Sequence, residues 1–173
     1  MFTHSYFLQF DPKQVAHSQP YPPLGTILAA ACVREKGFEV QLFDTMFAPG
    51  PELLHQRLKD YAPHILVIYD DGFNYLTKMC LSNMREAAFK MQSMAKAAGC
   101  KVIVTSSDAA DHSEQYLNMG ADYVIIGEAE NTLIDLLETF RSANVATDHI
   151  NGLVTLRDGA LVKNPPRKVS KDL

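Results

Sequence analysis

Short apolar runs alternate with helical patterns along almost the whole chain, and this alternation is the feature that most restricts the fold. The run Ile65–Tyr69 is continuously apolar, as is typical of strands covered on both faces. Between such runs, apolar residues recur at spacings of three and four, which predicts amphipathic helices. Strands joined by helical crossovers form parallel sheets with helices on both faces. The sequence therefore predicts an α/β protein.

The predicted architecture is a doubly wound, mostly parallel, five-stranded sheet of flavodoxin-like order 2-1-3-4-5. The expected strands are residues 6–10, 40–44, 65–69, 101–105 and 123–126. The expected helices cover residues 24–37, 51–61, 77–98, 113–119 and a segment around 133–140. For the first helix, spacing predicts a core-facing stripe, formed by Leu24, Ile27, Leu28, Ala31 and Cys32.

The C-terminal part has a different pattern. Two alternating apolar runs, 152–156 and 160–162, flank an Asp158-Gly159 pair, which is a β-hairpin signal. We therefore expect one domain over residues 1–150, followed by a hairpin and the start of a linker over residues 151–173. The charged end, after Pro165-Pro166, leads us to expect that a further domain follows.

Composition narrows the class of protein. The chain has 173 residues, 47% of them hydrophobic, and no apolar run near the ~20 residues of a membrane span. Its net charge of −4, with both signs interspersed, gives no reason to expect nucleic acid or a membrane as a partner. Three cysteines match no disulfide or metal pattern, so we expect a cytoplasmic protein. Cys32 and Cys100 are expected to be buried as small apolar residues.

The loop before the first helix is the first candidate binding element. Pro22 and Pro23 stiffen the chain, and Gly25 lets the backbone approach another group closely. In open α/β sheets, the carboxyl ends of the strands form a ligand crevice. We therefore predict that Pro22, Pro23, Leu24 and Gly25 bind a ligand there.

The other predicted strand ends are followed by small and polar residues. These candidates are Asp44, Asp70, Asp71, Thr105, Ser106, Ser107, Gly127, Glu128, Ala129 and Glu130. Such a set suits a ligand with amide or phosphate groups. The same residue types are favoured as helix caps, so for each single residue the capping alternative stays open. The five loops together favour a ligand.

Other chemistry has weaker support in the sequence. Asp70 and Asp71 with Asp44 could form a magnesium site. His17 and His112 fall in or beside predicted loops and are possible ligands, whereas the other four histidines are expected at the surface. The methionines of the long helix are expected to pack in the core. Phosphate-loop, dinucleotide and serine-nucleophile motifs are absent.

Four motifs, in order and covering nearly the whole chain, resemble the N-terminal cobalamin-binding domain of cobalamin-dependent radical S-adenosylmethionine (SAM) enzymes. They are Pro22-Pro23-Leu24-Gly25, Asp44 at the end of the second strand, the segment 127–133, and Gly152-Leu153 followed by Asn164-Pro165-Pro166-Arg167. This resemblance implies a flavodoxin-like domain that holds cobalamin at the strand ends. It also implies that the nucleotide tail lies beside strands four and five.

The sequence departs from the family pattern at three points. Residues 106–109 replace a Gly-Gly-Pro-His segment, and Ala129 replaces the second glycine of a Gly-Glu-Gly-Glu segment. The Asp-x-His-x-x-Gly motif of methionine synthase is absent. The resemblance therefore implies base-off cobalamin whose lower face is not ligated by that histidine.

The resemblance also implies partners. A radical SAM domain holds a 4Fe-4S cluster through Cys-x-x-x-Cys-x-x-Cys, which this chain lacks, so the cluster and SAM are expected only in another domain, in the same protein or in trans. The whole enzyme would be a methyltransferase, and the chain alone is expected to catalyse nothing. The alternatives are a receiver-like or flavodoxin-like interaction module without a cofactor, and a small nucleotide- or flavin-binding domain.

Overall fold

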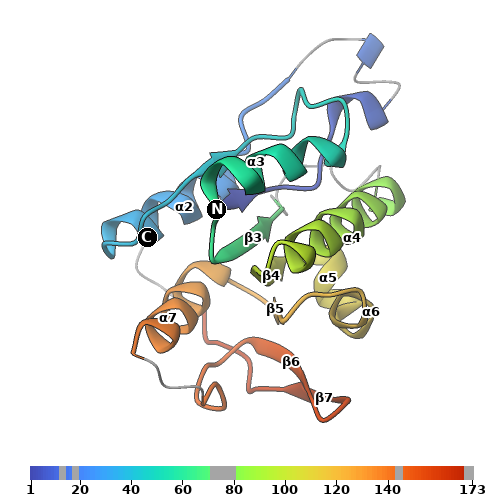
Figure 1. Ribbon diagram of the computed structural model, residues 1–173. Coiled ribbons are helices and arrows are strands. Elements are labelled where there is room, and N and C mark those ends of the chain that lie inside the picture. The colour runs from blue at the N-terminus through green and yellow to red at the C-terminus, as the bar shows by residue number, and fades with distance from the viewer. Residues whose placement is uncertain (12–14, 17–19, 71–80, 143–145, 170–173) are drawn as a thin grey trace.

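The computed structural model describes residues 1–11, 15–16, 20–70, 81–142 and 146–169, which form a seven-stranded sheet of order β2-β1-β3-β4-β5-β6-β7 (Figure 1). The first five strands are parallel, and the last two form an antiparallel hairpin that continues the sheet from β5. The strands are β1 Phe2–Thr3, β2 Leu42–Phe43, β3 Ile65–Tyr69, β4 Lys101–Thr105, β5 Tyr123–Ile125, β6 Leu153–Arg157 and β7 Ala160–Lys163. The predicted fold class and strand order are confirmed.

Helices cover both faces of the sheet (Figure 1). One layer contains α2 (Leu24–Glu35) and α7 (Ala129–Arg141). The other contains η2 (Pro51–Leu53), α3 (Leu54–Tyr61), α4 (Leu81–Ala97), α5 (Ser107–Asp111) and α6 (Ser113–Asn118). Alternate residues of β3 therefore enter different cores: Ile68 packs in the α3–α4 cluster and Val67 in the α2–α7 cluster. None of the described helices is long and apolar enough to cross a membrane.

The first strand lies earlier than predicted. Strand β1 is Phe2–Thr3, and the apolar run at 6–10 comes after it, with Leu8–Phe10 forming the 3-10 helix η1. Tyr6 and Phe7 are nearly inaccessible, but they pack in two different clusters and not as strand residues. The prediction of a strand at 6–10 was wrong because burial here comes from tertiary packing beyond the end of the sheet.

The core-facing side of α2 also differs from the prediction. The helix buries Thr26, Ala29, Ala30 and Val33 against the sheet and α7. Leu24, Ile27 and Leu28 are 56%, 37% and 52% exposed. Small residues allow the helix to approach its neighbours closely, which leaves the larger apolar residues outside. Cys32 is half-buried and Cys100 is buried, so only the second of these two predictions is fully confirmed.

The predicted hairpin is confirmed, and its turn explains the Asp-Gly pair. Asp158 and Gly159 have φ angles of 51° and 77°. Positive φ at both central residues is the requirement of a type I′ turn, which matches the twist of the flanking strands.

The segment after the hairpin is tied to α7 by a set of contacts that we call the C-terminal clasp, formed by Thr132, Asp135, Gly152, Asn164 and Arg167. Arg167 Nε donates to Thr132 Oγ1 at 2.7 Å, and its Nη2 pairs with Asp135. Thr132 Oγ1 in turn donates to the carbonyl of Asn151 at 2.9 Å. Asn164 Nδ2 donates to two carbonyls of the preceding loop, at 2.7 and 2.9 Å.

Gly152 is the sterically restricted point of the clasp. Its φ is +81°, and a Cβ there would lie 2.9 Å from the carbonyl oxygen of Ile126. Its N–H donates to the carbonyl of Pro165, and its own carbonyl accepts from the N–H of Ile126. Only glycine meets these requirements without strain.

Candidate ligand-binding rim

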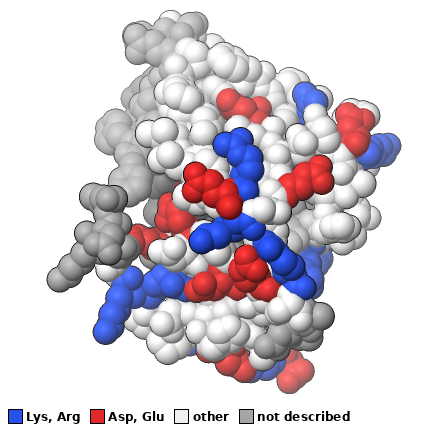
Figure 2. All heavy atoms as spheres, turned by 90° about the vertical axis from the view of Figure 1, so that its left-hand side faces the viewer, with Lys and Arg blue, Asp and Glu red and all other residues white. Residues whose placement is uncertain are grey.

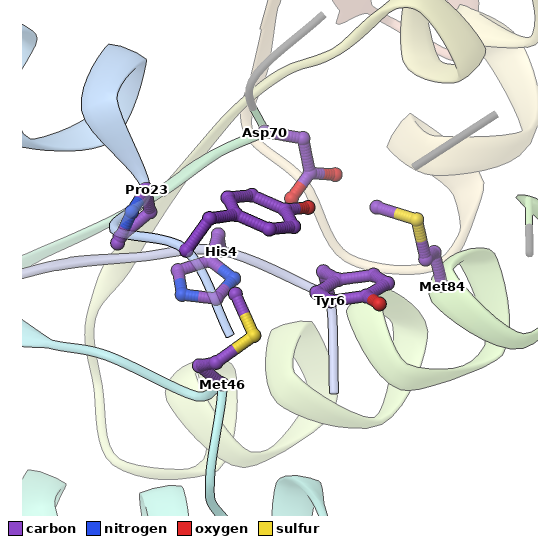
Figure 3. Close-up of a pocket in the computed structure, with 7 residues that line it drawn as sticks. His4, Tyr6, Pro23, Met46, Asp70 and Met84 are labelled. Carbon is purple, nitrogen blue, oxygen red and sulfur yellow. The ribbon is translucent and has the colours of Figure 1, made fainter. Parts of the chain in front are cut away.

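The carboxyl ends of β1, β2 and β3 surround a small cavity (Figure 3). It has a volume of about 10 Å³, room for roughly one water molecule. The lining side chains are His4, Tyr6, Tyr21, Pro23, Met46, Asp70 and Met84. They come from the loops after the three strands, the loop before α2, and the first turn of α4 (Figure 3). We call this edge of the sheet, with the loops after β4 and β5, the rim.

The loop before α2 is held against this cavity by two contacts. The ring of Tyr21 stacks on that of Tyr6, with centroids 5.7 Å apart. Thr26 Oγ1, in the first turn of α2, donates to the carbonyl of Tyr69 at 2.7 Å. The two contacts place the buried Pro23 at the cavity wall and leave Pro22 and Leu24 exposed beside it.

Asp70 is a buried carboxyl at the end of β3. It accepts two hydrogen bonds from Ser5, from the backbone N–H at 2.6 Å and from the hydroxyl at 2.8 Å. Burial raises the pKa of Asp70 above its usual value, although the two bonds from Ser5 act in the opposite direction. A buried carboxyl facing a cavity is a common feature of functional sites.

His4 and Asp44 form a pair at the ends of β1 and β2. His4 Nε2 lies 2.8 Å from Asp44 Oδ1, and its Nδ1 lies 3.0 Å from the hydroxyl of Thr45. Burial raises the pKa of Asp44, but the bonds from His4 and from the N–H of Met46 outweigh burial and lower the pKa overall. The His4 side chain is only 4% exposed, whereas the Asp44 side chain is 42% exposed.

The residues after β4 include a helix cap and an aspartate that forms a partly buried ion pair with α4. Ser106 Oγ accepts from the N–H of Ala109 at 2.9 Å and so caps α5, as the capping alternative predicted. Asp108 binds Arg85 through both carboxylate oxygens and accepts from the hydroxyl of Tyr116 at 2.8 Å. Burial raises the pKa of Asp108, but these bonds together lower it. Thr105 is buried and Ser107 is exposed.

The loop after β5 is open. Gly127 has a φ of +87°, and apart from its two chain neighbours no described residue has an atom within 4 Å of the position that a Cβ would take. Glu128 is exposed, whereas Ala129 is buried at the start of α7. Glu130 accepts a hydrogen bond from the hydroxyl of Tyr69 at 2.6 Å, which ties α7 to β3.

The candidate residues therefore divide into two groups. An exposed group lies at the rim surface: Pro22, Leu24, Asp44, Ser107, Gly127 and Glu128. A buried or half-buried group supports it: Pro23, Gly25, Asp70, Thr105, Ser106, Ala129 and Glu130. Asp71 and His17 lie outside the described residues, as do Cys80 and Met79.

Sequence reasoning missed the residues after β1. His4 was expected at the surface and is instead buried between β1 and β2, because the true first strand ends at Thr3. His112 is exposed and lies 3.8 Å from Asp108. Within the described part of the chain, no three acidic, histidine or cysteine side chains are grouped so that they could hold a metal ion. A first strand of two residues gave no signal from which His4 could have been found.

The surface formed by α2 and α7 carries no continuous patch of positive or negative charge. Figure 2 shows acidic and basic side chains interleaved on the face that is on the left in Figure 1, where α2 and α7 lie. Two of the ion pairs on α7 are Arg141 with Glu138 and Arg167 with Asp135. Electrostatic steering of a polyanion to this face is therefore not expected.

Comparison with known proteins finds the same fold in solved structures, although no sequence-based match is found. No protein-family model matches the sequence. No curated protein matches it either. Two solved enzymes have the same fold over nearly the whole chain. A radical SAM methyltransferase, TsrM from Kitasatospora setae, solved with cobalamin and a 4Fe-4S cluster, matches 98% of this chain with a TM-score of 0.73 and 14% identity.

The second is the cobalamin-dependent radical SAM enzyme OxsB, solved with aqua-cobalamin and SAM, which matches 97% of this chain with a TM-score of 0.67 and 16% identity. The match covers 29% of the TsrM chain and 22% of the OxsB chain. This chain therefore has the fold of one part of each enzyme and spans less than a third of their length.

Proposed function

We propose that this chain is the cobalamin-binding module of a radical SAM enzyme. The observation that carries the proposal is the fold shared, over 98% of the chain, with an enzyme solved with cobalamin bound. The rim supports it, because open α/β sheets bind their ligands at the carboxyl ends of the strands. The four motifs of the sequence support the same assignment.

The residues at the rim fit a broad, flat ligand with amide groups. Ser107 and Glu128 are exposed polar side chains after β4 and β5, and the backbone at Gly127 has open space beside it. Pro22 and Leu24 add exposed apolar surface. Because the cavity beneath has room for about one water molecule, the corrin would lie across the rim and not in a deep pocket.

In this proposal the chain's own residues bind and orient the cofactor. Both ring nitrogens of His4 already have protein partners, so His4 would position Asp44 and would not be free to ligate a metal. When bound, cobalamin supplies a cobalt centre for methyl-group chemistry. Residues 1–150 form the binding module, and residues 151–173 lead toward a domain with the cluster and SAM.

The test is retention of the cofactor. The purified chain is mixed with hydroxocobalamin and desalted, and its visible spectrum is recorded. We expect cobalamin to remain with the protein and to show base-off features. Clean separation of cobalamin from folded protein would overturn the proposal. We expect no methyl transfer from SAM by the chain alone, and activity only with a cluster-bearing partner.

One observation favours a second candidate, an interaction module without a cofactor. The cavity at the rim is very small, and Asp44 and Asp70 are already bonded to protein groups. The same desalting experiment separates the two candidates, because an interaction module would leave the column free of cobalamin.

A further inference from the structure

The edge strand β2, the loop after it and helix α3 form an apolar groove beside the rim, with which it shares Asp44. The groove has a volume of about 420 Å³ and is lined by Leu42, Leu53, Arg57 and Tyr61, among others. Leu42, Leu53 and Tyr61 are 43%, 38% and 46% exposed. Apolar side chains gathered in one exposed hollow indicate an interaction site rather than ordinary surface.

A protruding side chain stands in the same patch as the hollow. Phe47 also lines the groove, yet it is 73% exposed, the most exposed large apolar side chain among the described residues. An aromatic side chain buries 150–250 Å² when it enters a pocket, so leaving it in water is costly. The patch therefore contains both a projecting group and a recess of apolar character.

The groove also contains a cation and an anion that do not pair with each other. The guanidinium of Arg57 lies 5.7 Å from the ring centroid of Phe43 and has no carboxylate partner among the described residues. Asp44 uses Oδ1 for His4 and Met46, while Oδ2 has no hydrogen-bond partner in the described part of the chain. One patch thus presents both halves of an ion pair.

We propose that this patch binds a second copy of the chain. In a two-fold symmetric interface, each contact occurs twice with the roles exchanged. Arg57 of each copy would meet Asp44 of the other, and Phe47 of each copy would enter the groove of the other. A different partner would need its own projecting apolar side chain and its own charges opposite to Arg57 and Asp44. A second copy of this patch supplies all of these. The free edge of β2 lies at the same interface and is thereby protected from unspecific strand pairing.

The test is the oligomeric state of the full chain, measured by sedimentation equilibrium and by light scattering after gel filtration. We expect a concentration-dependent dimer for the wild type. Arg57→Glu places two like-charge contacts in the dimer and should raise its dissociation constant at least ~10-fold. Asp44→Arg should do the same. Arg34→Glu, on the exposed side of α2, is the matched control and should leave the dimer intact.

Mixing the two variants gives the decisive measurement. Arg57→Glu and Asp44→Arg each form repulsive pairs with themselves, but together they restore opposite charges at both contacts. We expect the mixture to dimerise when neither variant does alone. Phe47→Ser should also weaken the dimer, while Leu28→Ser, a similar change on α2, should not. Circular dichroism checks that each variant is folded.

Two results would overturn the proposal. The first is a wild type that remains monomeric up to its solubility limit. The second is a dimer that survives Arg57→Glu and Phe47→Ser. Neither measurement involves cobalamin, so failure here leaves the proposed function untouched.

Discussion

The rim and the C-terminal clasp both contain motif residues, but the side chains of the clasp bond within the chain, whereas several side chains of the rim are exposed. In the clasp, Thr132, Asn164 and Arg167 bond to one another, to α7 or to the preceding loop. At the rim, Pro22 and Leu24 are exposed beside a small cavity, and Ser107 is exposed after β4. The clasp residues therefore stabilise the fold, whereas these rim residues leave their side chains exposed at the surface.

This difference changes how motif resemblance should be interpreted. The Gly152-Leu153 and Asn164-Pro165-Pro166-Arg167 motifs hold the hairpin and the chain exit, and their geometry explains them without a ligand. Asn164 and Arg167 would be required in any domain that fastens its last segment in this way. The motifs at the chain exit therefore add nothing specific to the case for a ligand, which depends on the shared fold and on the rim.

The largest expected effect comes from breaking the clasp at Gly152. In Gly152→Ala, a Cβ would lie 2.9 Å from a backbone oxygen at a φ of +81°, so we expect the free energy of unfolding to fall by about 2–3 kcal/mol. Gly159→Ala is the matched control, because its φ is +77° but no described residue beyond its chain neighbours lies within 4 Å of the Cβ position. This change should lower the free energy of unfolding by about 1 kcal/mol. Urea denaturation measures both.

The comparison also predicts what Gly152→Ala does to binding. If the clasp is purely structural, the folded fraction of this variant should bind cobalamin as the wild type does. A folded variant with weakened cobalamin binding would show that the clasp is part of the site, and the division between the two regions would fail.

The strands that end at the rim differ in how well the sequence predicted them. Strands β3 and β4 were predicted at their observed bounds because they are central and covered on both faces, so burial and strand pairing coincide. Strand β1 has only two residues, and the apolar run after it is buried without strand pairing. The position of His4 at the rim could not be predicted for this reason.

Side-chain roles were predicted less well than elements. Ser106 was a candidate ligand contact, but its hydroxyl caps α5, a local role that the sequence could not separate from binding. The exposed stripe of α2 was expected in the core, because spacing shows that a helix has an apolar side but not which of two apolar sides packs inward. The hydrogen bonds of Arg167 depend on residues 32 and 35 positions away.

A smaller effect is expected from crowding the rim. Ser107 is exposed at the start of α5, so Ser107→Trp should change the free energy of unfolding by no more than about 0.5 kcal/mol. It should weaken cobalamin binding at least ~10-fold, equal to about 1.4 kcal/mol, if the ligand crosses this part of the rim. Gly25→Leu, at the start of α2, should act in the same direction.

The control for the rim variants is Asn118→Trp, which adds the same bulk at the exposed end of α6, before β5 begins. Spectrophotometric titration with hydroxocobalamin compares the three variants. Unchanged affinity in Ser107→Trp and Gly25→Leu would move the binding surface away from the rim. The exposure of the rim residues would then not indicate a cobalamin-binding surface.

The smallest expected effect concerns Asp70, the buried carboxyl of the rim. In Asp70→Asn, the side-chain oxygen can still accept from the N–H of Ser5, and the amide can donate to the Ser5 hydroxyl, so the fold should be retained. Burial raises the pKa of Asp70 above 3.8, so the folded state holds this proton more tightly than the unfolded state. Stability that depends on this proton is therefore lost as pH rises from about 3.8 through the folded pKa.

Asparagine does not titrate, so the stability of the wild type relative to Asp70→Asn should fall over that interval and then become constant. Asp44 and Asp108, whose pKa values are lowered, lose their contribution as pH falls, but they are present in both proteins and cancel in the difference. Urea denaturation at a series of pH values measures this difference, with the exposed Asp111→Asn as the control for loss of one charge. A difference that stays constant or rises with pH would mean that the folded protein holds this proton no more tightly than the unfolded chain, so Asp70 would ionise as readily inside the rim as in water. The rim would then hold a buried negative charge, and a cation rather than a neutral amide group would be its expected complement.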